Sequence, residues 1–292
     1  MAGDRPFPQA LNLAGTFHVE HPSFLWDLRR TPAIIPDSMS RIVAVANQKG
    51  GVGKTTTAIN LAAALAAFDQ RVLLVDLDPQ ANATSGMGFS KREESTVYSA
   101  LVSGQMGGSI RPTNFSNLWI VPSGRDLVGA EIELVEQVDR EARLRYALGD
   151  VRGSYDFVIV DCPPSLSLLT VNALTAADSV LVPIQTEYFA LEGLTELLET
   201  VERVRDSFNP MLSMEGIVLT MFDERTNLAR QVVDDIRQHF GDKVFETVIP
   251  RNIRLGEAPS FGKPVLSYDI KSKGAEAYLS LGREFLKRRE AK

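Results

Sequence analysis

The chain is poor in cysteine, with Cys162 as the only one among 292 residues. A single thiol excludes a disulfide framework within one chain, and it excludes a metal or iron–sulfur site built mainly from cysteines. Long apolar runs are also missing, because no stretch approaches the roughly 18 residues that a membrane span needs. The start of the chain lacks the basic and apolar regions of a secretory signal. Together these absences predict a cytoplasmic protein.

Charge is unevenly distributed along the chain. The formal net charge is −6, which argues weakly against nucleic-acid binding. Residues 251–292 differ, because they hold ten Lys and Arg residues against five Asp and Glu residues. Such a basic region on an acidic body is a candidate surface for a nucleic-acid backbone. A solvated helix end would show the same excess, so charge alone does not decide between the two interpretations.

Residues 1–40 differ in composition from the rest of the chain. They contain five prolines, two of the three histidines and no sustained hydrophobic period, which predicts a disordered extension. Met39 stands directly before the first strand pattern, and we favour the hypothesis that translation starts there. The alternative is a functional tail that recruits a partner through Phe17, Phe24, Leu25 and Trp26. We expect one domain over residues 41–292.

Strand and helix patterns alternate along that domain. The expected strands are continuous apolar runs at 41–47, 71–76, 118–121, 156–160, 179–183, 215–220 and 244–249. Helices are expected near 54–68, 126–148, 166–176, 190–208, 226–240 and 273–289. Strands without polar alternation are covered on both faces, which predicts an α/β fold with a doubly wound, mostly parallel sheet flanked by helices. Ligands of such folds bind at the carboxyl ends of the strands.

A glycine-rich loop between a strand pattern and a helix pattern is the most informative stretch. Its residues are Lys49, Gly50, Gly51, Val52, Gly53, Lys54, Thr55 and Thr56. Glycines allow backbone N–H groups to approach phosphate oxygens, and the helix amino terminus adds aligned donors. Lys54 would reach the β- and γ-phosphates, and the Thr55 hydroxyl would ligate Mg²⁺. The loop therefore predicts a nucleoside triphosphate site.

Three acidic residues stand at the ends of predicted strands. Asp76 and Asp78 follow the apolar run 72–75, and Asp161 follows the run 157–160. Because parallel strands end at one edge of a sheet, we expect these carboxylates beside the glycine loop. An acid in that place suits the Walker B role, in which it holds Mg²⁺ directly or through water. Each acid taken alone fits a strand-end or capping residue equally well.

The loop resembles the deviant Walker A loop of the ParA/Min-type ATPases, in which an early lysine precedes the usual one. The resemblance is to the ParA/Soj partition ATPases in particular, and it spans roughly residues 41–290. In that family the early lysine crosses a dimer interface to the partner's ATP, so the resemblance gives Lys49 this role. It also places Gly50 where two loops face each other, so that a larger side chain there would block the dimer.

The resemblance implies roles for the other site residues. Asp78 would orient or activate the attacking water, and Asp161 would be the Walker B residue. Asp76 would support Mg²⁺ or its water shell. Pro250 and Asn252 match positions near the adenine of ATP. The implied chemistry is a slow hydrolysis of ATP, timed by the arrival of the partner's lysine.

Two arginines match family positions that bind DNA nonspecifically in the dimer, namely Arg225 and Arg254. A few cations per subunit contact few phosphates, so dimerisation would raise DNA affinity steeply. The resemblance thus implies a homodimer with ATP sandwiched in it, nonspecific duplex DNA, nucleoid association, and a ParB-like partner that stimulates hydrolysis. The cargo would be a chromosome or a plasmid. Glu196 and Glu199 on the predicted helix 190–208 are one candidate surface for that partner, although an ordinary solvated helix face is the simpler interpretation.

Two rival interpretations stay open. A Min-type membrane-surface ATPase would share the loop and end in an amphipathic membrane helix. The helically spaced apolar residues near the end of the chain are Tyr278, Leu281, Phe285 and Leu286. We interpret them as the core-packing face of the last helix and expect no membrane contact. A metabolic or metal-cluster ATPase is disfavoured by the single cysteine, which we interpret as structural.

Overall fold

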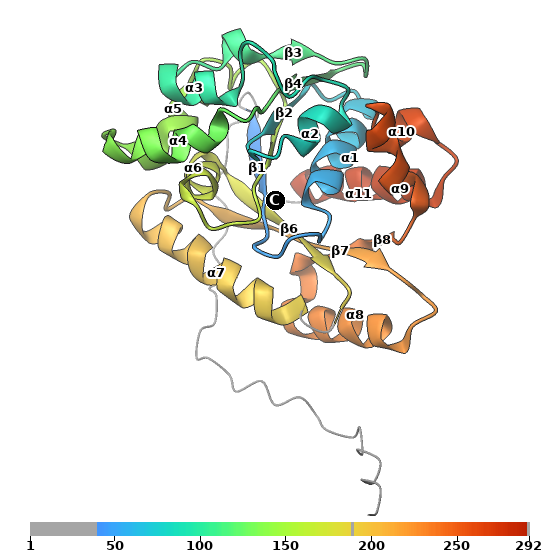
Figure 1. Cartoon of the computed structure of the whole chain (residues 1–292). Helices are drawn as coiled ribbons and strands as arrows, with labels where there is room; N and C mark the ends of the chain where they lie inside the picture. Colours follow the sequence, from blue (N-terminus) through green and yellow to red (C-terminus); the bar gives the residue numbers. More distant parts are fainter. Residues whose placement is uncertain (1–39, 188–189, 291–292) are drawn as a thin grey trace, which may run out of the picture. The chain divides into compact units, whose positions relative to one another are not determined.

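The computed structural model describes residues 40–187 and 190–290. The expectations for residues 1–39, an extension or a start at Met39, lie outside the described residues. The strands are β1 Arg41–Val45, β2 Val72–Asp76, β3 Arg111–Pro112, β4 Leu118–Val121, β5 Phe157–Asp161, β6 Ser179–Gln185, β7 Ser213–Phe222 and β8 Val244–Pro250. They form one sheet in the order β3-β4-β2-β5-β1-β6-β7-β8 (Figure 1). Every neighbouring pair is parallel except β3 and β4, which confirms the predicted fold class.

Helices connect the strands. The α-helices are α1 Lys54–Ala67, α2 Asn82–Gly86, α3 Val97–Ser103, α4 Leu127–Glu133, α5 Arg143–Gly149, α6 Leu168–Ala176, α7 Ala190–Ser207, α8 Asn227–Phe240, α9 Ile253–Glu257, α10 Val265–Tyr268 and α11 Lys273–Glu290. Short 3₁₀ turns are η1 Gly107–Ser109, η2 Leu134–Glu136, η3 Arg140–Ala142, η4 Gly241–Lys243 and η5 Ala258–Phe261. Six of these α-helices were not delimited by the sequence patterns, because α2, α3, α4, α5, α9 and α10 are too short for a helical period to stand out.

The single helix expected near 126–148 is wrong. The chain there forms α4, η2, η3 and α5 in succession. Gln137 is extended, with φ −85° and ψ 141°. Asp139 has a positive φ of 56°, a conformation that a continuing right-handed helix does not allow. The apolar period continues across this break, which is why the sequence pattern missed it.

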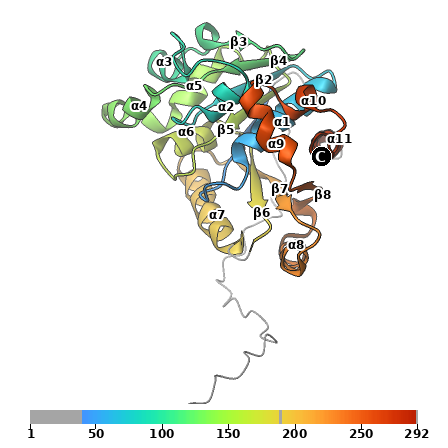
Figure 2. The ribbon, with the colours of Figure 1, turned by 45° about the vertical axis from the view of Figure 1, so that its right-hand side comes forward.

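The main core lies between one face of the sheet and the layer that holds α1 and α11. Alternate residues of the central strands, such as Val43 of β1 and Ile159 of β5, point into it. Figures 1 and 2 show α1, α9, α10 and α11 together on one side of the sheet, with α4, α5 and α6 on the other. Tyr278, Leu281 and Phe285 of α11 are buried in this core. The interpretation of their stripe as a packing face is therefore confirmed.

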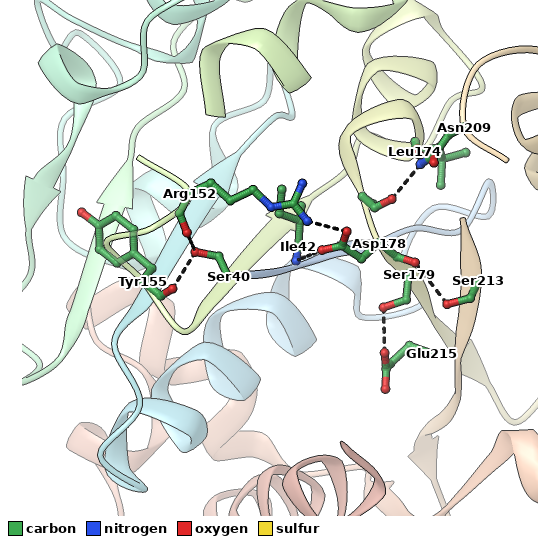
Figure 3. A network of polar contacts seen from close by, with 11 residues as sticks. Ser40, Ile42, Arg152, Tyr155, Leu174, Asp178, Ser179, Asn209, Ser213 and Glu215 are labelled. Carbon is green, nitrogen blue, oxygen red and sulfur yellow. Dashed lines mark hydrogen bonds and ion pairs between the residues drawn. The ribbon is translucent and has the colours of Figure 1, made fainter. Parts of the chain in front are cut away.

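A polar network closes the amino-terminal edge of the sheet, where β1, β6 and β7 begin (Figure 3). The Asp178 carboxylate accepts a hydrogen bond from the Ile42 N–H at 2.8 Å and one from the Arg152 guanidinium at 2.6 Å. Glu215 accepts from the Ser179 hydroxyl at 2.7 Å and forms a buried ion pair with Arg41. Charges at this edge are thus partnered inside the fold, as buried charges need to be.

Candidate nucleotide site

The glycine loop and the strand-end acids meet at the carboxyl edge of the sheet. β5 lies between β1 and β2, so the loop that follows β1 runs beside the ends of both other strands. Asp76 and Asp161 are register partners across β2 and β5. Each has the same strand parity as residues that face α1, such as Leu74 and Ile159, because side chains alternate along a strand. The predicted convergence of these acids at the loop is present.

The loop is held by backbone geometry and by two neighbouring strands. Gly51 and Gly53 have φ values of 77° and 88°, which a residue with a Cβ adopts only with strain. The Thr220 hydroxyl at the end of β7 donates to the Val52 carbonyl oxygen at 2.8 Å. Asn47 donates its side-chain amide to the Pro183 carbonyl oxygen at 2.8 Å. The sequence pattern gave no signal for these last two contacts, since both connect residues far apart in the chain.

Lys54 is buried at the start of α1. Its Nζ donates to the carbonyl oxygen of Lys49 at 3.0 Å. Burial lowers the pKa of Lys54, while the nearby carboxylate of Asp161 opposes that shift. A buried ammonium with one carbonyl partner would gain from a phosphate oxygen, since charge-assisted hydrogen bonds are about twice as strong as neutral ones.

Lys49 and Gly50 lie on the more open part of the loop. The Lys49 ammonium lies 3.6 Å from the carboxylate of Glu187, and both side chains are partly exposed. A Cβ added at Gly50 would meet no atom of the subunit within 4 Å. Gly50 is therefore not required by packing within its own chain.

Asp161 is the least satisfied charge at this edge. Both of its carboxylate oxygens are buried and have no hydrogen-bond partner in the described structure. Burial raises the pKa of Asp161 well above its usual value, and repulsion by Asp76 adds to the shift, while the neighbouring Thr55 hydroxyl opposes it. Two bare oxygens beside a hydroxyl fit a hard cation such as Mg²⁺. Since the described residues contain no group of three or more His, Cys, Asp and Glu side chains that could hold a metal, phosphate and water would complete its shell.

Asp76 organises the loop that follows β2. Its carboxylate accepts hydrogen bonds from the N–H and the hydroxyl of Thr84, each at 2.7 Å, and from the Asp78 N–H at 3.2 Å. Burial raises the pKa of Asp76 to about 6 despite these donors. The Ser123 hydroxyl donates to the Asp78 carbonyl oxygen at 2.8 Å. Thr84 and Ser123 thus position Asp78, and nothing in their local sequence marks them.

A pocket of about 210 Å³ opens beside the loop. Pro250 and Asn252, the two positions expected near an adenine, line it together with Met221 and Tyr278. Met221 has a positive φ of 53°, which is unusual for a bulky residue and costs conformational energy. The pocket borders Gly53 and Thr56, so a base placed there would stay connected to phosphates in the loop.

Arg225 lies in the loop after β7, and Arg254 lies on α9, which follows β8; neither residue lines the pocket. The Arg225 guanidinium makes a two-pronged contact with Asp223, at 2.8 and 2.6 Å, and its side chain is 83% exposed. Arg254 contacts Glu257 at 2.7 Å and Asp269 at 3.2 Å. Both arginines follow strands at the carboxyl edge of the sheet, and both are paired with carboxylates.

Comparisons with known proteins point to one family. A family profile described as an AAA domain matches residues 40–214. The chain is 56% identical over 253 residues to the chromosome partitioning protein ParA of Myxococcus xanthus, covering 86% of this chain and 89% of that protein. It is 55% identical over 248 residues to the sporulation initiation inhibitor protein Soj of Bacillus subtilis, covering 84% of this chain and 98% of that protein.

Solved structures show the same fold. A cobyrinic acid a,c-diamide synthase from Mycobacterium smegmatis, with bound ATP analogue and magnesium, has a TM-score of 0.76 and 37% identity, covering 86% of this chain and 96% of that chain. The cell division ATPase MinD of Pyrococcus furiosus has a TM-score of 0.71 and 26% identity, covering 86% of this chain and 100% of that chain.

Proposed function

This chain belongs to the family of ParA and Soj chromosome-partitioning ATPases, and we propose that it is an ATP-dependent dimerising switch that binds DNA nonspecifically. ATP and Mg²⁺ would occupy the carboxyl edge of the sheet. A slow hydrolysis of ATP, stimulated by a ParB-like partner, would reset the switch and drive partitioning of a chromosome or plasmid. Similar structures that contain ADP or an ATP analogue with magnesium support the choice of cofactors.

The observation that carries the proposal is the bare Asp161 carboxylate. Its two buried oxygens lie without partners at the end of β5. A buried unpaired carboxylate destabilises the fold, and a ligand cation would relieve that cost. Thr55 and Asp161 would hold Mg²⁺, and Asp76 would support its water shell while fixing the Asp78 loop.

In-line phosphoryl transfer to water depends on positioning and on charge neutralisation. Bound Mg²⁺ would supply part of that neutralisation. Lys54 would exchange the Lys49 carbonyl oxygen for phosphate oxygens. Asp78 would orient the attacking water, and Lys49 of the partner subunit would reach the same phosphates. Pro250 and Asn252 would contact the adenine.

The dimer can be tested at Gly50. Gly50→Val should abolish ATP-dependent dimerisation in sedimentation velocity while nucleotide affinity stays within about twofold, because a Cβ there meets nothing within the subunit. Gly53→Val is the contrasting variant. Its φ of 88° makes any side chain strained, so it should lose nucleotide binding itself. An intact dimer in Gly50→Val would contradict the placement of two loops face to face.

DNA binding is the decisive measurement. Binding to unrelated duplex DNA should require ATP and should weaken steeply between low and moderate salt. Arg225→Ala and Arg254→Ala should each reduce the affinity for duplex DNA, by the same factor whatever the DNA sequence, while ATP binding stays unchanged. The Asp78→Ala variant, expected to retain unhydrolysed ATP, serves as the positive control. No binding by the wild type and by Asp78→Ala under any nucleotide would overturn the DNA switch.

The Min-type alternative would need an exposed apolar face on the last helix to contact a membrane. Tyr278, Leu281 and Phe285 are buried, so α11 has no free apolar stripe at these positions for a bilayer. No helix among residues 40–187 and 190–290 is both long and apolar enough to cross a membrane. Sedimentation with anionic liposomes and ATP tests the alternative directly. The hypothesis that translation starts at Met39 is tested separately by mass spectrometry of the native amino terminus.

A further inference from the structure

The outer face of α4 and η2 exposes an apolar stripe. Val128, Ile132 and Val135 are 57%, 75% and 52% exposed. Because η2 continues α4 with helical backbone angles, their spacing of four and three residues places them on one face. Val138, which is 84% exposed, follows η2 in the chain. Single exposed apolar residues are ordinary, whereas several along one short segment mark an interaction surface.

This stripe is not the face by which the segment packs in its own subunit. Leu127, Ala130 and Leu134 are fully buried and already provide that contact. A helix that is apolar on a second face has a second partner or lies in a core. The exposure of Ile132 excludes the core within the described part of this chain.

Acidic residues accompany the stripe. Residues 126–141 contain six Asp and Glu residues and one Arg. That residue, Arg140, pairs with Glu141 at 2.9 Å. Glu133 and Glu136 are exposed and directly follow Ile132 and Val135 in the chain. The surface thus combines an apolar centre with a negative flank.

We propose that this face binds a basic amphipathic helix of a partner protein. We name it the α4 docking surface, made of Val128, Ile132, Glu133, Val135, Glu136 and Val138. Helix recognition of this kind uses apolar anchors at i, i+3 or i+4, and i+7. Lysines or arginines beside the anchors would face the acidic flank, which favours the correct partner and speeds association.

Two segments of this chain are candidates for that occupant, and neither fits. Residues 1–39 carry three arginines and no lysine against four acidic residues, so they have no basic excess. In a second copy, α11 ends in basic residues, but its apolar residues Tyr278, Leu281 and Phe285 are buried. The charge pattern therefore favours a different protein over either of these.

Helix α7 provides a comparison within the same molecule. Glu196 and Glu199 are exposed there, which is necessary if they form the partner surface considered in the sequence analysis. Among the α7 side chains that the structure describes, Leu194, Leu197, Val201 and Val204 are buried and Leu198 is half-buried. These side chains present charge without a fully exposed apolar residue, whereas α4 with η2 presents both, which favours the latter as the docking face.

The chemistry can be tested with a fluorescent 14-residue helical peptide of leucine and lysine and a scrambled peptide of equal composition. The full chain should bind the amphipathic peptide about tenfold more tightly than the scrambled one. The double variant Ile132→Ser, Val135→Ser should lose this preference, whereas Ile270→Ser, at a site 58% exposed, should keep it. Glu136→Lys should weaken binding, and Glu199→Lys should not.

Equal binding of both peptides, or an unchanged preference in the double variant, would refute the α4 docking surface. A wild-type dimer without nucleotide that is absent in the double variant would also refute this assignment, because the surface would then bind a second copy of the chain.

The assignment of the partner rests on the proposed function, which names a ParB-like protein. Stimulation of hydrolysis by that protein should fall about tenfold in the Ile132→Ser, Val135→Ser variant, with basal hydrolysis and DNA binding unchanged. Full stimulation of the variant would show that the surface does not serve this partner. Absence of stimulation in the wild type would instead count against the proposed function, while the peptide experiment still decides the docking surface.

Discussion

The two edges of the same sheet treat charge in opposite ways. At the amino edge, Asp178 accepts bonds from Ile42 and Arg152, and Glu215 accepts from Ser179 and Arg41. At the carboxyl edge, Asp161 is fully buried and has no hydrogen-bond partner for either oxygen. One edge uses its charges to fix the starts of strands. The other keeps a charge unsatisfied, which lowers stability and leaves a place for a ligand.

The ion pairs of the two edges differ in the same way. The Arg41–Glu215 pair at the amino edge has side chains 9% and 1% exposed, so removing one partner would strand a buried charge. The Arg225 side chain at the carboxyl edge is 83% exposed, and such pairs contribute little to stability. A pair that costs little to open is compatible with the DNA contact proposed for Arg225, in which a phosphate would replace Asp223.

Replacing one aspartate by asparagine at each edge should show the difference between the two edges most clearly. Asp161→Asn should reduce ATP hydrolysis by at least about 100-fold, measured as single-turnover phosphate release. It should also raise the free energy of unfolding of the nucleotide-free protein by about 1 kcal/mol, because a buried unpaired charge is removed. A variant that is both active and less stable in urea would show that Asp161 is a structural residue.

Asp178→Asn is the matched change at the amino edge, with the opposite expectation. It should lower the free energy of unfolding by about 2 kcal/mol, since the Arg152 guanidinium loses its charged partner. Urea titration monitored by circular dichroism measures this loss. Nucleotide affinity of the folded fraction should stay unchanged. Loss of nucleotide binding without loss of stability would contradict a purely structural amino edge.

The pH dependence of stability sharpens the comparison further. The pKa of Asp76 is raised to about 6 by burial, so its protonated form favours the folded state. That contribution is complete below the ordinary aspartate pKa and is lost as the pH rises through about 6. The nucleotide-free protein should therefore be more stable at pH 5 than at pH 7.5 by about 1 kcal/mol. Asp76→Asn should flatten this dependence, and a wild type that loses stability between pH 7.5 and pH 5 would contradict it.

The stability that the amino edge contributes should change with pH in the opposite direction. Its hydrogen bond with Arg71 lowers the pKa of Asp156, which precedes β5. A lowered pKa contributes stability above the ordinary aspartate value, and the contribution is lost as the pH falls below it. Asp156→Asn should therefore have a lower free energy of unfolding than the wild type at pH 7, and it should lose less of that free energy between pH 7 and pH 3, as measured by urea titration at each pH.

The sequence predicted what depends on local pattern. The apolar runs located the central strands, and the strand-end position of Asp76 and Asp161 placed both at one edge because parallel strands end together. The glycine loop was recognisable because its backbone favours glycine at Gly51 and Gly53, where φ is positive. Each of these signals lies within a few neighbouring residues, so no tertiary information was needed.

What the sequence missed depends on contacts between distant segments. Thr84 holds Asp76, and it also accepts a hydrogen bond from the Ser123 N–H at 2.8 Å, a contact that forms only where the loop after β4 meets α2 in the folded chain. The break in the expected helix 126–148 was missed for a related reason. Its apolar period continues through Val135 and Val138, but those residues face solvent, so the pattern described a surface where we expected a core-facing helix.

The smallest expected effect concerns the exposed pair at the carboxyl edge. Asp223→Asn should raise the ATP-dependent affinity for duplex DNA by about threefold, because Asp223 occupies the Arg225 guanidinium in the way a phosphate would. Fluorescence anisotropy at two salt concentrations measures it, and the same change in an Arg225→Ala background should have less effect. The pKa of Asp223 is lowered to about 2, chiefly by the Arg225 hydrogen bond, so the carboxylate is charged at every working pH. Weaker DNA binding by Asp223→Asn would show that Asp223 positions the arginine for phosphate, and the carboxyl edge would then resemble the amino edge in using its carboxylates to fix structure.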